Sequence, residues 1–259
     1  MQNQYNGVVE AYDEVCQQAE NKSFYEWVDD PSILYPGQIC YAPVWYEKSN
    51  KWILFEDNYD PVNEENSTWK VVKFKIDNFL KPTSYVMKYF QLEKTENLIT
   101  TIGKIRPVIL LKKTISDWLN PDTYSEDHWL CLPLFEYKTR HNQNYVINDQ
   151  RFKIPDRLYI PPRYNAKPGI PLESAARFQA LQMINQEYLK PLKAFCKEKN
   201  MQYPFKIIDY ALKIIMYHFF KNLNLFVELN EEGTVYALFV ECVNDYIDAA
   251  LKDSLHDMK

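Results

Sequence analysis

The sequence predicts an α+β protein, because segments with the alternating pattern of strands fill its middle and segments with helical periodicity lie toward both ends. Of its 259 residues, 46% are hydrophobic and 25% are charged, so the chain can bury a core and wholesale disorder is excluded. Twenty Tyr, fourteen Phe and six Trp further favour strands. A chain of this length is expected to form one or two domains.

The first predicted element is a helix from Val8 to Trp27, with apolar residues on one face and acidic or amide residues on the other. After Gly37 the pattern changes to alternation, which is typical of strands. Six segments are predicted as strands: 38–46, 51–57, 67–76, 105–112, 128–135 and 157–160.

Helical periodicity returns at Leu172, where apolar residues spaced by three and four predict a helix to about residue 189. Pro191 interrupts it, and Pro204 opens a further, mainly helical stretch. The predicted organisation is an acidic N-terminal helical segment over 1–36 and an expanded, strand-rich part with a late helix over 37–191. A hinge over 192–203 and an acidic helical unit over 204–259 follow.

Several classes of function are excluded by composition. The chain has five glycines and none of the glycine-rich phosphate-binding or nucleophile-elbow motifs. Its five cysteines are scattered without a C-x-x-C pair, so we expect neither a disulfide framework nor a metal site, and no cofactor. No signal-peptide pattern or membrane-length apolar run occurs, which predicts a cytoplasmic protein without a membrane partner.

Charge is unevenly distributed along the chain. Residues 1–36 hold one lysine and seven acidic residues, and residues 200–259 hold five lysines and nine acidic residues. The middle is therefore net positive, although the whole chain has a formal charge of −5. This pattern does not suit a simple nucleic-acid binder, which needs net positive charge. It suits a basic middle that is shielded by its own ends or by partners, or else ordinary charge for solubility.

Four sequence features occur in an order that resembles the PemK/MazF-like family. They are GQIC at 37–40, GKIRPVILL at 103–111, LCLP at 130–133 and the predicted helix ESAARFQALQMI at 173–184. The resemblance covers roughly residues 37–190, with an expansion of about 60 residues between the first two motifs. It implies an SH3-like, PemK/MazF-type β-barrel with flanking helices, followed here by the C-terminal helical unit.

The resemblance also implies a metal-free RNA-cleaving site. In the family it is made by the arginine of the R-P pair in the second motif and by a Thr or Ser two residues after the proline that ends the third motif. Arg106 matches the arginine, but Phe135 occupies the hydroxyl position and Glu136 follows it. A phenylalanine cannot transfer a proton, so we expect a catalytically inactive scaffold. Two alternatives remain: an endoribonuclease in which Arg106 works with Thr139 or His141, and an antitoxin-like or structural barrel that binds RNA without cleaving it.

The layout is similar to the MazF-like subunit of CRISPR-linked Lon–SAVED protease systems. The similarity implies a regulatory protein that holds a sigma-factor-like partner inactive and is cut by the protease in antiviral signalling. We expect the cut in the hinge, between Ala194 and Phe195. The small C-terminal unit either packs on the barrel or keeps an apolar face for the partner. Its candidate partner-binding residues are Ile207, Ile208, Tyr210, Ile214, Phe219 and Phe220.

Overall fold

The computed structural model describes residues 6–46, 52–58, 60, 62, 68–73, 99–100, 102–113, 127–137, 143–163, 167–223 and 231–256. The chain forms two compact units. The larger unit comprises Met1–Ala42 and Ile105–Lys259, and the smaller unit comprises Pro43–Lys104. The expansion between the first two motifs is therefore a compact unit in its own right, and the unit boundaries do not fall at the predicted hinge.

The smaller unit contains a three-stranded antiparallel sheet of order β4-β3-β5. These strands are β3 (Trp52–Asn58), β4 (Thr68–Lys73) and β5 (Ile99–Thr100). Strands β3 and β4 coincide with two of the predicted strands and pair along their full lengths, with an irregularity between Glu56 and Asn58.

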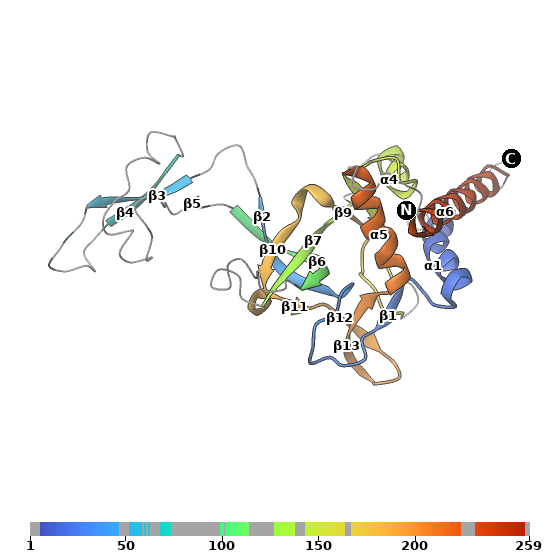
Figure 1. Ribbon diagram of the computed structural model, residues 1–259, viewed down its shortest axis with the longest axis horizontal. Coiled ribbons are helices and arrows are strands. Elements are labelled where there is room, and N and C mark those ends of the chain that lie inside the picture. Colours follow the sequence, from blue (N-terminus) through green and yellow to red (C-terminus); the bar gives the residue numbers. More distant parts are fainter. Residues whose placement is uncertain are drawn as a thin grey trace. The chain divides into compact units, whose positions relative to one another are not determined.

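The larger unit is built on a mostly antiparallel sheet of order β11-β2-β6-β7-β9-β8, with β10 also paired to β7 (Figure 1). The described strands keep this open order and form no closed barrel, so the SH3-like fold is not confirmed. The predicted strands over 38–46, 105–112, 128–135 and 157–160 are confirmed. The strands are β2 (Ile39–Tyr46), β6 (Ile102–Lys113), β7 (His128–Glu136), β8 (Arg157–Ile160), β9 (Ser174–Arg177), β10 (Gln182–Asn185) and β11 (Lys190–Pro191).

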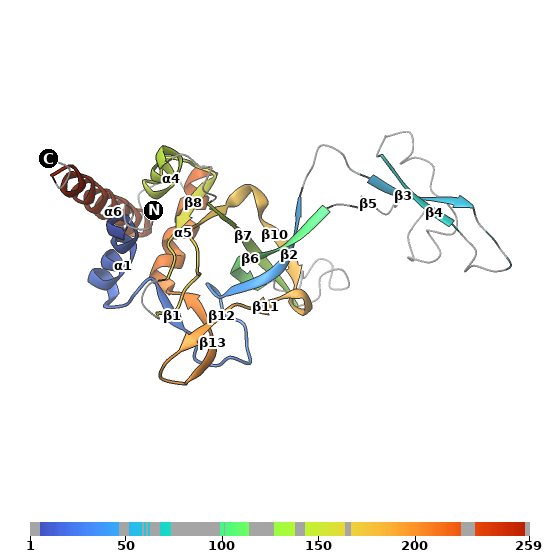
Figure 2. The same cartoon turned by 180° about the vertical axis from the view of Figure 1, so that it is seen from behind.

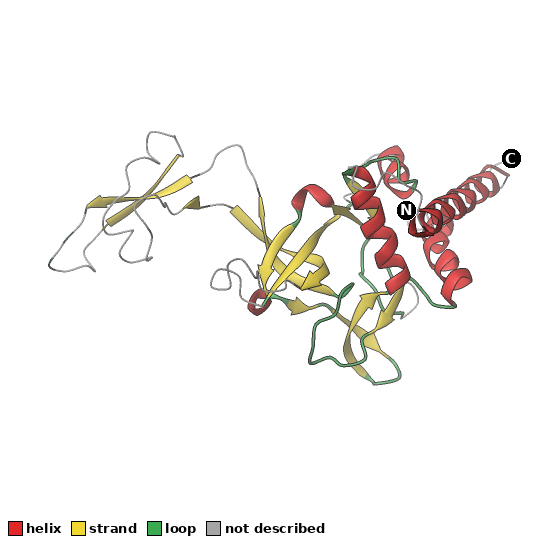
Figure 3. Ribbon diagram, viewed as in Figure 1, coloured by secondary structure: helices red, strands yellow, loops and turns green. Residues whose placement is uncertain are grey.

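Four α-helices are described in the larger unit, and they gather on one side of its sheet (Figure 3). Helices α1 and α6 lie side by side in both views (Figures 1 and 2). A single cluster of buried side chains extends through the larger unit. Helix α1, strand β7, strand β13 and helix α6 each contribute to it, for example with Tyr12, Leu132, Phe205 and Phe239 respectively. The helices are α1 (Asn6–Glu20), α4 (Gln143–Gln150), α5 (Asp209–Asn222) and α6 (Glu231–His256).

The late helix predicted over 172–189 is wrong. Its residues form β9, the 3-10 turn Phe178–Ala180, β10 and the 3-10 turn Gln186–Tyr188. Strand β9 lies between β7 and β8, and β10 pairs with β7, so the backbone groups are satisfied by neighbouring strands. The adjacent Ala175 and Ala176 are both buried, as expected for a strand covered on both faces. Tertiary pairing here overrides a helical pattern of good helix formers.

The N-terminal helix is also shorter than predicted, because α1 ends at Glu20 and the chain then enters strand β1 (Tyr25–Trp27). Strand β1 joins β13 (Met201–Ile207) and β12 (Lys193–Cys196) in a second three-stranded sheet. Residues 201–207 are therefore a strand, and the C-terminal helix α5 begins only at Asp209. No described helix is long and apolar enough to span a membrane.

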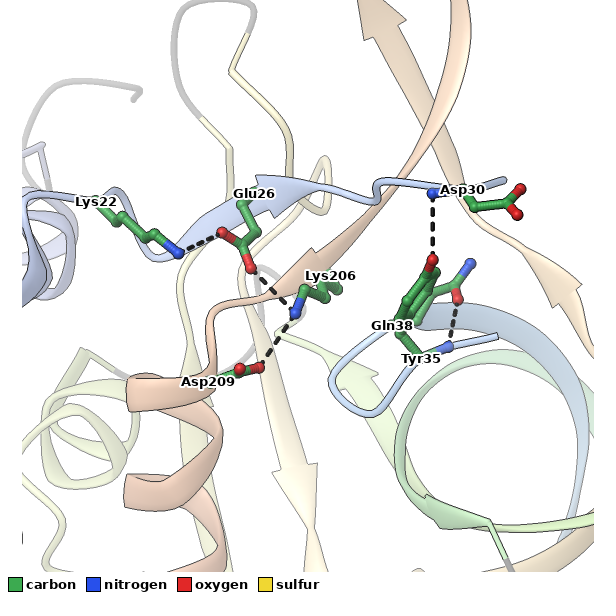
Figure 4. A network of polar contacts seen from close by, with 7 residues as sticks. All are labelled: Lys22, Glu26, Asp30, Tyr35, Gln38, Lys206 and Asp209. Carbon is green, nitrogen blue, oxygen red and sulfur yellow. Dashed lines mark hydrogen bonds and ion pairs between the residues drawn. The ribbon is translucent and has the colours of Figure 1, made fainter. Parts of the chain in front are cut away.

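A polar network ties the N-terminal strand to the C-terminal part of the chain (Figure 4). The Nζ of Lys206 lies 3.1 Å from a carboxylate oxygen of Glu26 and 3.1 Å from one of Asp209. Beside it, Gln38 is fully buried and accepts a hydrogen bond from the backbone N–H of Tyr35 at 3.0 Å. This network links β1, β13 and the first turn of α5.

Candidate functional site

The resemblance placed Arg106 and Phe135 at the two catalytic positions, and the structure brings these residues together. Val108 on β6 lies opposite Pro133 on β7, and the same register sets Arg106 opposite Phe135. Leu132 and Leu134 point into the core, so Pro133 and Phe135 occupy the other face of β7. The guanidinium carbon of Arg106 lies 4.5 Å from the ring centroid of Phe135, within cation–π range.

A second arginine contacts the same ring. The guanidinium carbon of Arg177, at the end of β9, lies 4.6 Å from the centroid of Phe135. Arg177 also lies directly opposite Arg157 in the β8–β9 register. Strands β6, β9 and β8 therefore bring Arg106, Arg177 and Arg157 to one region of the sheet, and Phe135 on β7 lies between Arg106 and Arg177. We call Arg106, Phe135, Arg157, Arg177 and Asp149 the arginine cluster.

Asp149, near the end of α4, is the carboxylate of this cluster, and its side chain is fully buried. The phenol of Tyr137 donates a hydrogen bond to Oδ2 at 2.7 Å, and Nη2 of Arg157 lies 3.2 Å from Oδ1. Burial raises the pKa of Asp149 to about 6, although the Tyr137 hydrogen bond and the charge of Arg177 oppose that rise. Burial likewise lowers the pKa of Arg157.

The aromatic rings around Arg157 and Asp149 restrict both side chains. The guanidinium carbon of Arg157 lies 4.1 Å from the ring centroid of Tyr145, and Nη1 of Arg157 donates a hydrogen bond to the Tyr145 hydroxyl. Tyr137 stacks on Tyr159, and the hydroxyl of Tyr159 donates to Glu173 at 2.7 Å. Helix α4 is thereby attached to the edge of the sheet. The chemistry that the arginine cluster can perform is binding and orienting an anion.

The other predicted catalytic residues, Thr139 and His141, lie outside the described residues. The sequence motifs did not point to Arg157, Arg177 or Asp149. Arg177 was placed in a predicted helix, where nothing would set it against Phe135. A search for charged residues in short apolar strands would have found Arg157 and Arg177, which lie opposite each other at one end of the β8–β9 pair.

The predicted hinge is a β-hairpin. Strands β12 and β13 pair from Lys193 opposite Pro204 to Cys196 opposite Met201. At the expected cleavage bond, Ala194 is buried, while Phe195 is half exposed. The bond between Ala194 and Phe195 thus lies in a paired strand, and cleavage there needs the hairpin to open first, because a protease binds an extended stretch free of pairing. All four residues at the hairpin tip, 197–200, are exposed.

The candidate partner-binding residues fall into two groups. Ile207, Ile208 and Ile214 are buried in the core that the C-terminal helices share with the sheet, so they do not face a partner in this fold. The other three, Tyr210, Phe219 and Phe220, are partly buried, and Phe219 stacks on Phe178 at 5.1 Å. Of the two alternatives for the C-terminal unit, packing on the rest of the chain is observed.

The two acidic ends of the chain meet in one helix pair. Tyr12 of α1 contacts Phe239 of α6 edge to face, at 5.7 Å between ring centroids. The side-chain amide of Gln18 on α1 donates to the hydroxyl of Tyr246 on α6 at 2.9 Å. Buried side chains on both helices face inward, and five described acidic side chains on these helices are exposed: Glu14, Glu20, Glu241, Asp245 and Asp248.

Within the described ranges, no group of three or more His, Cys, Asp or Glu side chains is arranged to hold a metal ion. The described cysteines are all reduced, and burial raises the pKa of the Cys131 thiol to about 12, so it is not a nucleophile at neutral pH. Comparison with protein-family models, curated proteins and solved structures finds no match for this chain. The proposals below therefore depend on the geometry and on the sequence motifs.

Proposed function

We propose that this chain is a regulatory protein without catalytic activity that holds a basic, sigma-factor-like partner through the acidic helix pair α1–α6. Proteolysis of the chain by a protease of the Lon–SAVED type releases the partner. The single observation that carries the proposal is the meeting of the two acidic ends of the sequence in one helix pair, with acidic side chains directed outward.

The acidic surface supports a basic partner because it concentrates negative charge from distant parts of the sequence. Glu14 and Glu20 come from α1, and Glu241 and Asp245 come from α6. A nucleic-acid-binding protein presents positive charge toward phosphates, and an acidic surface of this kind competes for it. The apolar faces of α1 and α6 are used within the core, so charge rather than apolar area supplies the recognition.

The absence of catalysis is supported by the chemistry of Phe135. Metal-free RNA cleavage needs a group that moves a proton beside the cation that stabilises the phosphorane charge. The ring that contacts the guanidinium of Arg106 has neither a proton to donate nor a lone pair to accept one. This contact therefore supports a chain without catalytic activity.

The proposal is tested by measuring the affinity of the full chain for a purified extracytoplasmic-function-type sigma factor. The double variant Glu241→Lys/Asp245→Lys is expected to weaken binding at least tenfold at 0.1 M salt, because charge recognition dominates. Glu198→Lys on the exposed hairpin tip is the matched control and should bind as the wild type does. Equal affinity of all three proteins, or no binding by the wild type, would refute the proposal.

A metal-free endoribonuclease is the second candidate. The observation in its favour is the pair of arginines on Phe135, which would hold a phosphodiester. Incubating the wild type and Arg106→Ala with long single-stranded RNA in EDTA separates the candidates. Cleavage by the wild type that is lost in the variant would replace the regulatory proposal with the enzymatic one.

A further inference from the structure

The β12–β13 hairpin carries exposed positive charge that the rest of the chain leaves uncompensated. Residues 190–199 contain four lysines and one glutamate, and all five of these side chains are exposed. Within the described part of the chain, none of the four lysines forms an ion pair with a carboxylate, and the Nζ of Lys199 instead lies 3.8 Å from the ring centroid of Tyr203. The hairpin is therefore a basic surface on a chain whose net charge is −5.

An aromatic side chain is exposed at the centre of this basic surface. Lys193 and Phe195 share one face of β12, because Ala194 and Cys196 are buried on the other. Phe195 is 46% exposed, and Lys197 follows two residues later, at the start of the turn. Lysines alone would be explained as protection of a short edge strand, since β12 pairs only with β13 in the described sheet. An exposed phenylalanine among them is not explained in this way, and an apolar centre with a charged rim is typical of protein interfaces. We call Lys193, Phe195, Lys197 and Lys199 the basic hairpin surface.

The acidic helix pair has a matching arrangement on α6. Leu238 is 54% exposed, and Glu241 and Asp245 follow it by three and seven residues, which places all three on one face of the helix. The buried residues Phe239 and Val243 mark the opposite face. An exposed apolar side chain is thus bordered by carboxylates here. The two surfaces are complementary in charge, and each has an apolar centre.

The two complementary surfaces lie apart in the folded chain. Both belong to the larger unit, and α6 and β13 contribute to the same core, which fixes their relative positions. The free end of the hairpin is away from α1 and α6 in both views (Figures 1 and 2). The basic hairpin surface is therefore left for another molecule, and a second copy of this chain offers a fitting acidic surface.

We propose that the basic hairpin surface of one copy docks on the acidic helix pair α1–α6 of a second copy. Phe195 and Leu238 are the apolar centres of this contact, and the lysines face Glu241 and Asp245. Because the two surfaces differ, the contact is heterologous, and a pair of copies still has one hairpin and one helix pair free. Association therefore continues head to tail into a ring or a filament, instead of stopping at a two-fold dimer. The inference uses the acidic surface of the proposed function but needs no sigma-factor-like partner.

Sedimentation velocity of the full chain alone measures this association. At about 0.05 M salt, the mean sedimentation coefficient of the wild type should rise as the chain concentration increases through the micromolar range. Raising the salt to about 0.5 M should weaken the association at least tenfold, because screening shortens the reach of charge interactions. Lys197→Glu/Lys199→Glu should stay monomeric under both conditions. The matched control is Lys112→Glu/Lys113→Glu, which makes the same change in net charge at exposed positions of β6 and should associate as the wild type does.

A mixture of two variants provides a test that a misfolded variant cannot pass. Glu241→Lys/Asp245→Lys should also be monomeric alone, because its helix pair no longer attracts the hairpin. Mixed with Lys197→Glu/Lys199→Glu, it should associate again, since each reversed surface then meets a surface of opposite charge.

Three results would overturn the inference. They are a wild type that stays monomeric at low salt and high micromolar concentration, association of Lys197→Glu/Lys199→Glu as strong as that of the wild type, and a mixture of the two variants that stays monomeric. A sigma factor that binds a chain which is itself monomeric would overturn this inference and leave the proposed function standing. Self-association that follows the expected pattern, without any binding of a sigma factor, would support this inference alone.

Discussion

The burial of Asp149 leads to a quantitative prediction for the variant Asp149→Asn. Asparagine has nearly the same shape and can still accept the hydrogen bond from Tyr137, but it cannot ionise. The pKa of Asp149 rises from its ordinary 3.8 to about 6 in the folded chain. The wild type therefore pays for an ionised, buried carboxylate at neutral pH, whereas the variant does not.

The size and sign of the effect follow from linkage between protonation and folding. A group whose pKa is higher in the folded state contributes stability that is complete below its unfolded pKa. That stability is lost as the pH rises through the folded pKa. The difference between 3.8 and about 6 corresponds to about 3 kcal/mol. Between pH 4 and pH 7, the free energy of unfolding of the wild type should fall by about 2.4 kcal/mol relative to Asp149→Asn, because part of the change has already occurred at pH 4.

Urea unfolding of both proteins at pH 4, 5, 6 and 7 provides the measurement, since the difference between them cancels all other titrating groups. Asp248→Asn is the matched control. Asp248 also faces an arginine, Arg151, but it is exposed and its pKa is lowered by that hydrogen bond. Its contribution must have the opposite sign, so the free energy of unfolding of the wild type should increase relative to that of Asp248→Asn as the pH rises. A pH-independent difference for Asp149→Asn would refute the reasoning.

Three further predictions concern the core and the hairpin. Burial lowers the pKa of His218 to about 4, so its contribution to stability is lost as the pH falls through that value. In a plot of unfolding free energy against pH, measured by urea unfolding, His218→Gln should therefore flatten the decline on the acid side. Gly37 has φ +80°, and a Cβ there would lie 2.7 Å from the carbonyl oxygen of Ile207; Gly37→Ala should therefore lower the unfolding free energy by more than about 1 kcal/mol, and an unchanged urea midpoint would contradict this. Limited digestion with a lysine-specific protease should cut the exposed hairpin tip at Lys197 or Lys199, and the fragments should co-elute in gel filtration until urea separates them.

Strands were predictable where the alternation of the sequence was supported by β-branched and aromatic residues. Segments such as 105–112 and 157–160 combine these residues with turn signals at their ends, and both are strands in the structure. The segment 172–189 lacks that composition. Its alanines and glutamines favour a helix, and only pairing with β7 and β8, which lie far away in the sequence, makes it extended.

The candidate site was only half predictable for a related reason. Motif order set Arg106 and Phe135 on two strands, and their contact follows once those strands pair in register. Arg177 and Asp149 reach the same place through β9 and α4, whose positions depend on the tertiary fold. The spacing of Arg177 and Asp149 in the sequence does not predict that they lie close together. Phe135, which is predicted to leave the site without a proton-transferring group, contacts both guanidinium groups.

The shared core places a condition on any control by proteolysis. After a cut at the hairpin tip, the residues beyond it still include β13, which pairs with both β1 and β12. They also include α5 and α6, whose buried side chains lie in the same core as Leu132 and Tyr12. The ion pair of Lys206 with Glu26 ties that part further to the N-terminal strand β1 (Figure 4). A single cut therefore leaves the acidic helix pair assembled, and release of a partner bound there requires the protease to unfold or degrade one fragment.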